Sequence, residues 1–349
     1  MDLGNATSPG ARTAAEDGPA WPQQAARTCS YAEAINQALS QAMELDDRVI
    51  ILGQLVDYKP GVFGTTTGLV ERFGAERVQD FPVAESVMTS AAIGAALVGM
   101  RPVLIHHRLD FMMYSMDAIV NWLSLWRFKS NNESGLPVVI RAIVGKGWGQ
   151  GPQHSKSLHA WFAHLPGLRV AVPATAFDAK GLLLESIFGE DPAIIIEHRS
   201  LFGLHDRVPS LPYRVRYGKA VVRRKGTDVT LAAIGMMVPL ALRAAAQLAS
   251  RSVEAEVIDL RTVSPLDIDT VCESVATTGR LVVADPAWCT GSVASEVIAA
   301  ACERAGRSLK ANPGRVCLPD SHAPMSAVLE EAYYPTEASI VDQVLAQFR

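Results

Sequence analysis

Short apolar runs that alternate with helical stretches constrain the fold of this chain more than any other feature. Four such runs in the first part of the chain are RPVLIHH, LPVVIRAIV, LRVAVP and PAIIIEHR, and helical stretches such as SVMTSAAIGAALVG and AFDAKGLLLESIFG separate them. A strand that is apolar on both faces needs helices on both faces, which is the arrangement of a mainly parallel sheet. With 349 residues, 49% of them hydrophobic, the chain can bury such a core. The sequence therefore predicts an α/β fold.

The alternation is interrupted once, which divides the chain into two domains. Residues 1–27 are rich in Ala, Gly, Pro and Gln without a periodic apolar pattern, and we expect a disordered tail there. A first domain is expected over residues 28–202, beginning with a helix capped by Ser30. Residues 203–216 lose the periodicity and carry two prolines, which predicts a linker. Residues 217–349 resume the alternation, so the sequence predicts a second, smaller, doubly wound α/β domain.

Composition excludes several classes of partner. The formal net charge is −4 without a basic stripe, so we expect no nucleic-acid binding. The five cysteines are an odd number and contain no CxxC pair, which favours a reducing cytosol. The N-terminal residues lack an apolar signal core, and charged or proline residues interrupt the longest apolar stretches. We therefore expect a cytoplasmic protein that neither crosses nor enters a membrane.

Three positions that follow predicted strands carry side chains suited to an aromatic cofactor. They are Glu85, the Asp110-Phe111 pair and His154. A carboxyl group can exchange a proton with a ring nitrogen, an aromatic ring can stack on a flat heterocycle, and a histidine can move protons near neutral pH. Each position also has an ordinary structural interpretation. Glu85 could favour a helix N-terminus, Phe111 could belong to the core, and His154 could lie in a surface turn.

Longer motifs indicate a family. The chain resembles the beta subunit of 2-oxo acid dehydrogenases, the decarboxylating component of the pyruvate and branched-chain complexes, over about residues 28–349. The resemblance rests on the strings DFPVAES, DFMMYSMDAIVN, PQHSKSLHAWFAHLPGLRVAVPATAFDAKGLL and AEVIDLRTVSPLD. It implies a thiamine diphosphate pyrimidine-binding domain followed by a transketolase C-terminal-type domain. It also implies an α2β2 assembly in which the beta subunits associate and a lipoyl acyltransferase accepts the product.

The resemblance implies a divided cofactor site. The chain contains no GDG motif followed by an Asn, the arrangement that binds magnesium and the diphosphate in such enzymes. Magnesium and diphosphate are therefore expected on an alpha subunit, no metal ligand is expected here, and activity is expected only with that partner.

Residue by residue, the resemblance assigns roles to Glu85, Phe111 and His154, and we expect Gln54 and Asp110 to contact the cofactor as well. Glu85 matches the glutamate that hydrogen-bonds the aminopyrimidine ring and promotes its imino tautomer. Phe111 matches the aromatic residue packed against that ring, with Asp110 beside it. His154 matches a histidine that assists proton movements and passage of the acyl group. Gln54 stands where the family commonly has an acidic residue, so a charge role there is in doubt.

The strand before Phe111 also departs from the family. His106, His107 and Arg108 place three potential cations near the cofactor. Alternate residues of a strand face opposite sides, so His106 and Arg108 would share one face, and some of the three could be interface residues. Alternatively, at least one contacts an anionic part of the substrate. These alternatives stay open.

The dehydrogenases often bind a monovalent cation in this domain. Whether this chain does so stays open, because Gly189 stands where the family has a carboxylate. His164 and Trp288 also match family positions, and we expect both to have packing roles.

Three hypotheses for the function follow. The first is a two-component thiamine diphosphate enzyme that decarboxylates a 2-oxo acid and passes the acyl group to a lipoyl acceptor. The second is a split transketolase or carboligase that transfers a ketol or acyl unit to an aldehyde-type acceptor. The third is a non-catalytic homologue that binds a partner. The neutral Gln54 supports this hypothesis, and the presence of Glu85 argues against it.

Overall fold

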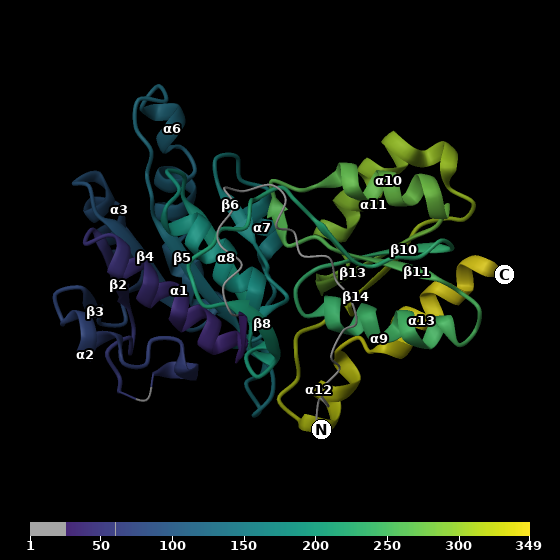
Figure 1. The fold of residues 1–349 in the computed structure, drawn as a ribbon, viewed down its shortest axis with the longest axis horizontal. Coiled ribbons are helices and arrows are strands. Elements are labelled where there is room, and N and C mark those ends of the chain that lie inside the picture. The colour runs from purple at the N-terminus through teal and green to yellow at the C-terminus, as the bar shows by residue number, and fades with distance from the viewer. Residues whose placement is uncertain (1–25, 60) are drawn as a thin grey trace.

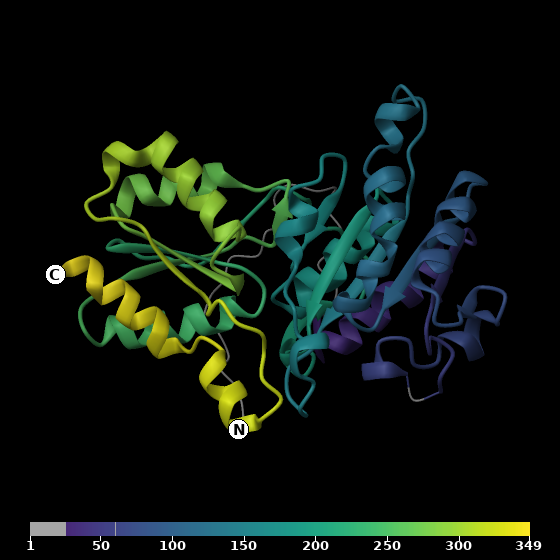
Figure 2. The ribbon, with the colours of Figure 1, turned by 180° about the vertical axis from the view of Figure 1, so that it is seen from behind.

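The computed structural model describes residues 26–59 and 61–349, which form two domains that lie side by side (Figure 1 and Figure 2). The first domain is built on a seven-stranded sheet in which every neighbouring pair is parallel except the pair of β12 with β6. The parallel sheet predicted from the four apolar runs is confirmed. Its strands, in spatial order, are β12 (Thr262–Ser264), β6 (Arg169–Ala171), β7 (Ala193–His198), β5 (Val139–Val144), β4 (Arg101–His106), β2 (Val49–Gly53) and β3 (Val78–Asp80).

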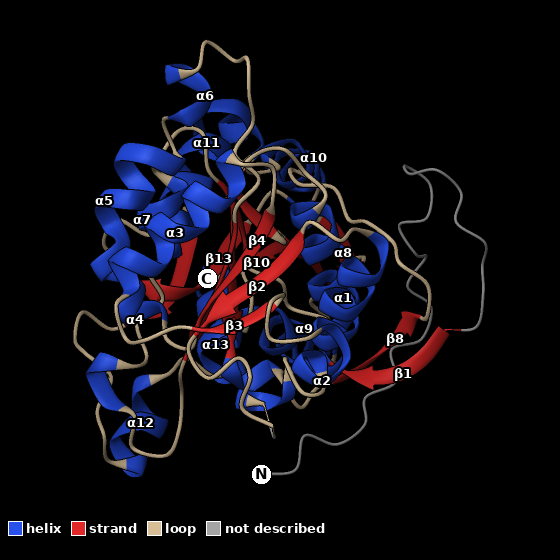
Figure 3. Cartoon of the chain, turned by 90° about the vertical axis from the view of Figure 1, so that its left-hand side faces the viewer, coloured by secondary structure: helices blue, strands red, loops and turns tan. Residues whose placement is uncertain are grey.

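Helices cover both faces of this sheet, as its apolar strands require (Figure 3). Strand β2 shows the division, since Ile50 and Leu52 pack with α3 while Val49 and Ile51 pack with α1 and α8. The helices of the first domain are α1 (Tyr31–Leu45), α2 (Leu69–Phe73), α3 (Glu85–Leu97), α4 (Leu109–Met112), α5 (Met116–Ala118), α6 (Trp126–Lys129), α7 (His159–Ala163) and α8 (Ala176–Ile187).

The start of the first domain follows from local sequence. The Ser30 side chain accepts from the N–H of Glu33, and the Glu33 carboxylate accepts from the N–H of Ser30, so both groups cap α1. The cap predicted at Ser30 is confirmed.

Two expectations about the flanks of this domain need revision. Residues 26 and 27 lie in β1 (Ala26–Ser30), which pairs antiparallel with β8 (His205–Pro209), so strand β8 occupies part of the expected linker. Two-residue alternation in short strands at an edge is too weak a pattern to predict them. The rest of the expected disordered tail, residues 1–25, lies outside the described residues.

The second domain is smaller and has a five-stranded sheet. Its three central strands and β14 are parallel, and β9 joins antiparallel at the edge. The strands, in spatial order, are β14 (Gly314–Leu318), β13 (Leu281–Trp288), β10 (Val229–Ala233), β11 (Ala255–Asp259) and β9 (Val221–Arg224). The helices are α9 (Met237–Ala249), α10 (Ile268–Thr278), α11 (Val293–Ala305), α12 (Ala327–Tyr333) and α13 (Glu337–Leu345).

Several contacts join the two domains into one unit. Strand β12 belongs to the second half of the chain, yet it pairs with β6 of the first domain. Arg223 of β9 forms ion pairs with Asp178 of α8 and with Asp259 of β11, the latter at 2.9 Å. His159 of α7 lies 2.9 Å from Asp285 of β13, and both side chains are buried. The orientation of the domains is therefore held by buried charges as well as by apolar packing.

None of the helices within residues 26–59 and 61–349 is both long enough and apolar enough to cross a membrane.

Candidate functional site

The predicted site residues gather at the carboxyl edge of the first sheet. Gln54 follows β2, Glu85 begins the helix after β3, and Arg108 follows β4 after one intervening residue. His154 lies in the loop after β5. Ligand crevices of parallel sheets form at this edge, because the loops after neighbouring strands meet there.

Glu85 is a buried carboxyl group at the start of α3, with 8% of the residue exposed. Gln54 Nε2 donates to Glu85 Oε1 over 3.3 Å, and Ser115 Oγ donates to the Glu85 carbonyl oxygen over 2.8 Å. Ser115 in turn accepts a hydrogen bond from Thr89. Glu85 does begin a helix, but its carboxyl group is oriented by Gln54, so the helix-terminus interpretation does not account for all of its contacts.

Phe111 and His154 form an aromatic pair. Their ring centroids lie 5.3 Å apart with perpendicular planes. The carbonyl oxygen of Gln150 lies 3.1 Å from His154 Nδ1, which therefore carries the proton and leaves Nε2 available as an acceptor. The loop before His154 is tightly folded, since a Cβ at Gly145 would lie 1.8 Å from Gln150 Oε1. The glycines of this segment thus allow the close approach that positions His154.

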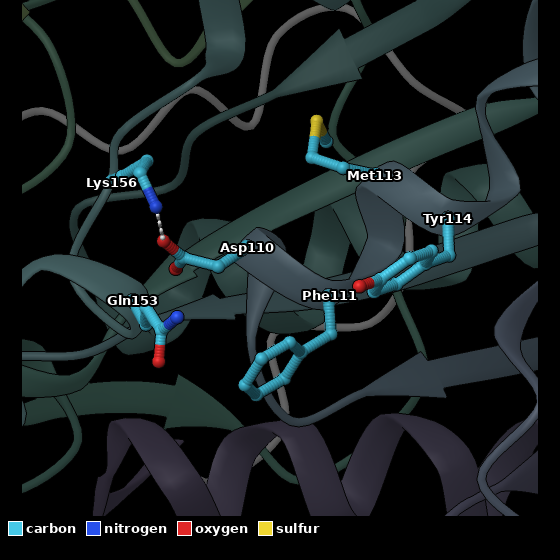
Figure 4. Close-up of a pocket in the computed structure, with 6 residues that line it drawn as sticks. All are labelled: Asp110, Phe111, Met113, Tyr114, Gln153 and Lys156. Atoms are coloured by element: carbon cyan, nitrogen blue, oxygen red, sulfur yellow. Dashed lines mark hydrogen bonds and ion pairs between the residues drawn. The ribbon is translucent and has the colours of Figure 1, made fainter.

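An open pocket of about 290 Å³ lies beside these rings (Figure 4). Lys156 Nζ donates to Asp110 Oδ1 over 2.9 Å on one side of the pocket, as Figure 4 shows. The other carboxylate oxygen, Oδ2, is buried and has no hydrogen-bond partner among the described residues. The pocket is lined by Asp110, Phe111, Met113, Tyr114, Gln153 and Lys156. Glu85 and His154 are not among the residues that line it.

The three basic residues near the end of β4 differ in charge. Burial lowers the pKa of His106 to about 3 and that of His107 to about 4, so both rings are neutral at pH 7. The His107 ring nitrogen Nε2 lies 2.5 Å from the Gln54 carbonyl oxygen. Strand β4 ends at His106, and Arg108 stands at the N-cap position of α4 without a capping side-chain hydrogen bond, so the expected strand alternation does not reach Arg108. Of the three potential cations, Arg108 is the one that is charged.

The sequence did not decide whether the loop around Gly189 binds a monovalent cation, and in the structure this loop binds a side chain of the protein. Arg101 Nη1 donates to the carbonyl oxygens of Ile187, over 3.1 Å, and Gly189, over 2.7 Å. Arg101 Nη2 also pairs with Glu190. These carbonyl oxygens are therefore already bonded to a guanidinium group.

Trp288 packs against the apolar cluster of Leu318, Ala323, Tyr333 and Tyr334, in agreement with the expected packing role. Its Nε1 donates to the Ser321 carbonyl oxygen and to the Tyr333 hydroxyl group. His164 ends α7, with its backbone N–H bonded to Ala160.

Four residues that the sequence did not single out contribute to this edge of the sheet. Lys156 pairs with Asp110, and Ser115 positions Glu85. Arg141 of β5 and Glu197 of β7 form a fully buried, two-bonded ion pair inside the sheet, at 2.6 and 2.8 Å. A charged residue in an otherwise apolar strand was the available signal, because such a residue needs a buried partner.

The described residues fit one half of a thiamine diphosphate site. A buried carboxyl group, an aromatic ring and a histidine with a free nitrogen suit the aminopyrimidine end of that cofactor. Within the part of the chain that the structure describes, no three His, Cys, Asp or Glu side chains are placed to hold a metal ion.

Comparisons with known proteins support this assignment. The transketolase pyrimidine binding domain matches residues 27–203, and the transketolase C-terminal domain matches residues 218–340. The chain is also 40% identical to the 2-oxoisovalerate dehydrogenase subunit beta of Bacillus subtilis, covering 91% of this chain and 99% of that protein. The chain belongs to the transketolase-like family that includes the beta subunits of 2-oxo acid dehydrogenases. The resemblance inferred from the motifs is confirmed.

Two further relatives are also named as beta subunits of oxidoreductases or dehydrogenases. The acetoin:2,6-dichlorophenolindophenol oxidoreductase subunit beta of Cupriavidus necator is 43% identical, covering 90% of this chain and 96% of that protein. The pyruvate dehydrogenase E1 component subunit beta of Staphylococcus epidermidis is 38% identical, covering 90% and 97%. A solved structure titled as the inactive beta4 tetramer of a split-gene transketolase has the same fold, with a TM-score of 0.73, 24% identity and coverage of 91% and 97%.

Proposed function

We propose that this chain is the beta subunit of a two-component thiamine diphosphate enzyme that decarboxylates a 2-oxo acid and transfers the acyl group to a lipoyl acceptor. The observation that carries the proposal is the buried Glu85 carboxyl group, oriented by Gln54 at the edge of the sheet where Phe111 and His154 also lie.

Each site residue has a role in this proposal. Bound thiamine diphosphate supplies the electron sink for decarboxylation. Glu85 holds a proton at the aminopyrimidine ring nitrogen and so favours the reactive tautomer. Phe111 packs against the ring, and His154 Nε2 accepts or returns a proton near the substrate. Gln54 orients Glu85 as a neutral hydrogen-bond donor, which explains how the amide can replace an acidic residue at this position.

An alpha subunit is required by this proposal, because the described residues provide one half of the cofactor site. We expect that subunit to carry the GDG motif, the magnesium ion and the diphosphate contacts. The relatives are themselves named as beta subunits. Association of two beta subunits is supported by large apolar side chains that are exposed to solvent. They lie on α3, directly after it, in the segment before α6 and on α6, and they are Val87, Leu97, Val98, Trp122 and Phe128.

The dehydrogenase and oxidoreductase names of the relatives favour acyl transfer over ketol transfer. An intact Glu85 with an ordered hydrogen bond argues against a non-catalytic homologue.

The test is Glu85→Gln in the chain purified with its alpha subunit. Loss of the proton donor should lower kcat by about 10²- to 10⁴-fold, as for other acid-base groups. The exposed Glu133→Gln is the matched control and should retain full turnover. Both variants are assayed with oxidised lipoamide, whose disulfide bond accepts the acyl group and is reduced, and with aldehyde acceptors, and their unfolding midpoints are compared. Unchanged turnover in a folded Glu85→Gln assembly would refute a catalytic role, and activity with aldehydes alone would refute the lipoyl acceptor.

A further inference from the structure

Two arginines lie on the same phenylalanine at the carboxyl edge of the first sheet. The Arg108 guanidinium lies 5.2 Å from the Phe63 ring centroid, and the Arg199 guanidinium lies 4.7 Å from it. Arg199 also lies 3.8 Å from the ring centroid of Trp148. Arg108 follows β4 and Arg199 follows β7, which are the two neighbours of β5 in the sheet. Loops after alternating strands thus bring two cations to one place.

Neither of these two cations forms an ion pair with a carboxylate of the described residues. Within the described residues neither guanidinium has a carboxylate in ion-pair range, and the Nε of each is buried without a hydrogen-bond partner. Arg108 Nη1 donates a hydrogen bond to the backbone carbonyl oxygen of His107, and this oxygen carries no charge. Burial lowers the pKa of Arg108 and the charge of Arg199 lowers it further, while the charge of Asp110 acts in the opposite direction without offsetting them. Two like charges that are partly desolvated and close together are costly unless an anion joins them.

The surroundings favour an oxyanion. Aromatic rings cover the flat faces of a guanidinium and leave its N–H edge free, and that edge matches the oxygen atoms of a carboxylate or a phosphate. Trp148 is exposed and stands in a loop with positive φ angles at Gly147, Trp148 and Gly149.

The pair is also adjacent to the candidate cofactor site. His107, next to Arg108, contacts the backbone of Gln54, and the Gln54 side chain donates to Glu85. An anion held by the arginines would therefore lie beside the reacting region and be separate from the Glu85 contact itself.

We propose that Arg108 and Arg199 together bind an oxyanion group, either a carboxylate or a phosphate. This group belongs to the substrate or the acceptor and is located at a distance from the reacting carbon of that molecule. The identity of the molecule as substrate or acceptor rests on the function proposed above, whereas oxyanion binding by the two arginines does not. The site favours small molecules with a second anionic group over those with an uncharged chain.

Direct binding is tested on the full chain without turnover. Inorganic phosphate, and separately glutarate, is titrated while tryptophan fluorescence is followed, with sodium chloride added to keep the ionic strength constant. We expect a saturable change that Trp148→Phe removes, because the Trp148 ring contacts Arg199. Arg108→Gln and Arg199→Gln should each weaken binding about tenfold or more, as expected for loss of a charged hydrogen bond. Arg199→Lys, which keeps the charge without the planar fork, should bind with intermediate affinity.

The matched control is Arg214→Gln, because Arg214 also lies on an aromatic ring, 5.0 Å from the centroid of Phe188, with half of its side chain exposed. Its binding should equal that of the unmodified chain. Absence of saturation with both anions, or an equal loss in Arg214→Gln, overturns the proposal. A response to phosphate alone or to glutarate alone supports it and assigns the source of the oxyanion.

The second arm uses the assembled enzyme. The ratio of kcat/KM for a 2-oxo acid with a second carboxylate or phosphate to that for one with an uncharged chain should fall about tenfold in Arg199→Gln. If instead the free chain binds neither anion and both arginine variants fail to co-purify with the alpha subunit, the arginines are interface residues and the proposal is wrong. Intact anion binding beside unchanged turnover in Glu85→Gln would refute the proposed function alone.

Discussion

The charged residues at the domain junction and those at the carboxyl edge of the first sheet are both withdrawn from water, yet their partners differ. At the junction, Arg223 pairs with Asp178 and Asp259, and Arg261 also pairs with Asp178 at 2.9 Å. Burial alone would raise the pKa of Asp178, but the two arginines hold it below its usual value. At the edge of the sheet, Arg108 and Arg199 have no such partners among the described residues.

The difference separates stability from binding. A buried charge that is fully paired holds the protein together, and removing one partner exposes the whole desolvation cost of the other. A partly buried charge without a partner contributes no such stability and remains available to a ligand. The same kind of substitution should therefore lower the stability strongly at the junction and change it little at the edge of the sheet.

The largest effect is expected at the junction. Arg223→Met should lower the free energy of unfolding by about 3–5 kcal/mol, because Asp178 and Asp259 lose their shared cation. Denaturant titration of the chain measures this loss. The control is Arg304→Met, which removes the exposed pair with Asp269 and should change the free energy of unfolding far less than Arg223→Met does. Equal losses in the two variants would remove the distinction between the regions.

A smaller effect concerns pH at the edge of the sheet. The folded pKa of His106, about 3, lies below its unfolded value of about 6.5, so the unfolded chain binds more protons between these values. The stability contributed by the neutral ring is full above pH 6.5 and is lost as the pH falls towards 3. By pH 4 the free energy of unfolding should fall by at most about 3 kcal/mol through this ring.

Unfolding midpoints measured between pH 7.5 and 4.5 test this expectation. His106→Gln should reduce the slope of stability against pH, whereas the exposed His205→Gln should leave it unchanged. An unaltered slope in His106→Gln would show that other groups cause the acid sensitivity of this region.

The smallest effect on stability is expected at Arg108. Arg108→Met removes a partly desolvated cation and one contact with Phe63, and the two changes should nearly cancel, leaving the free energy of unfolding within about 1 kcal/mol. Denaturant titration in buffer without phosphate or carboxylate measures it. A loss as large as that in Arg223→Met would mean that Arg108 is a structural residue.

Local sequence predicted the central strands because each is a continuous apolar run. It did not predict β9, β12 or the β1 and β8 pair, which are short or lie at edges, where pairing depends on distant parts of the chain. In the site, the position of Glu85 followed from the strand before it. The roles of Lys156 and Arg199 did not, because their neighbours Asp110 and Phe63 are far away in the sequence.

Apolar periodicity by itself determined that this chain forms two α/β domains, and the resemblance of its motifs to a known family indicated the cofactor. Both are properties of neighbouring residues, and hydrophobic burial acts on them without regard to exact contacts. Only the tertiary structure decided which charged groups have partners. The energy of a charge depends on its burial and on the distance to its counter-ion, so Arg223 became a structural residue and Arg199 a binding residue.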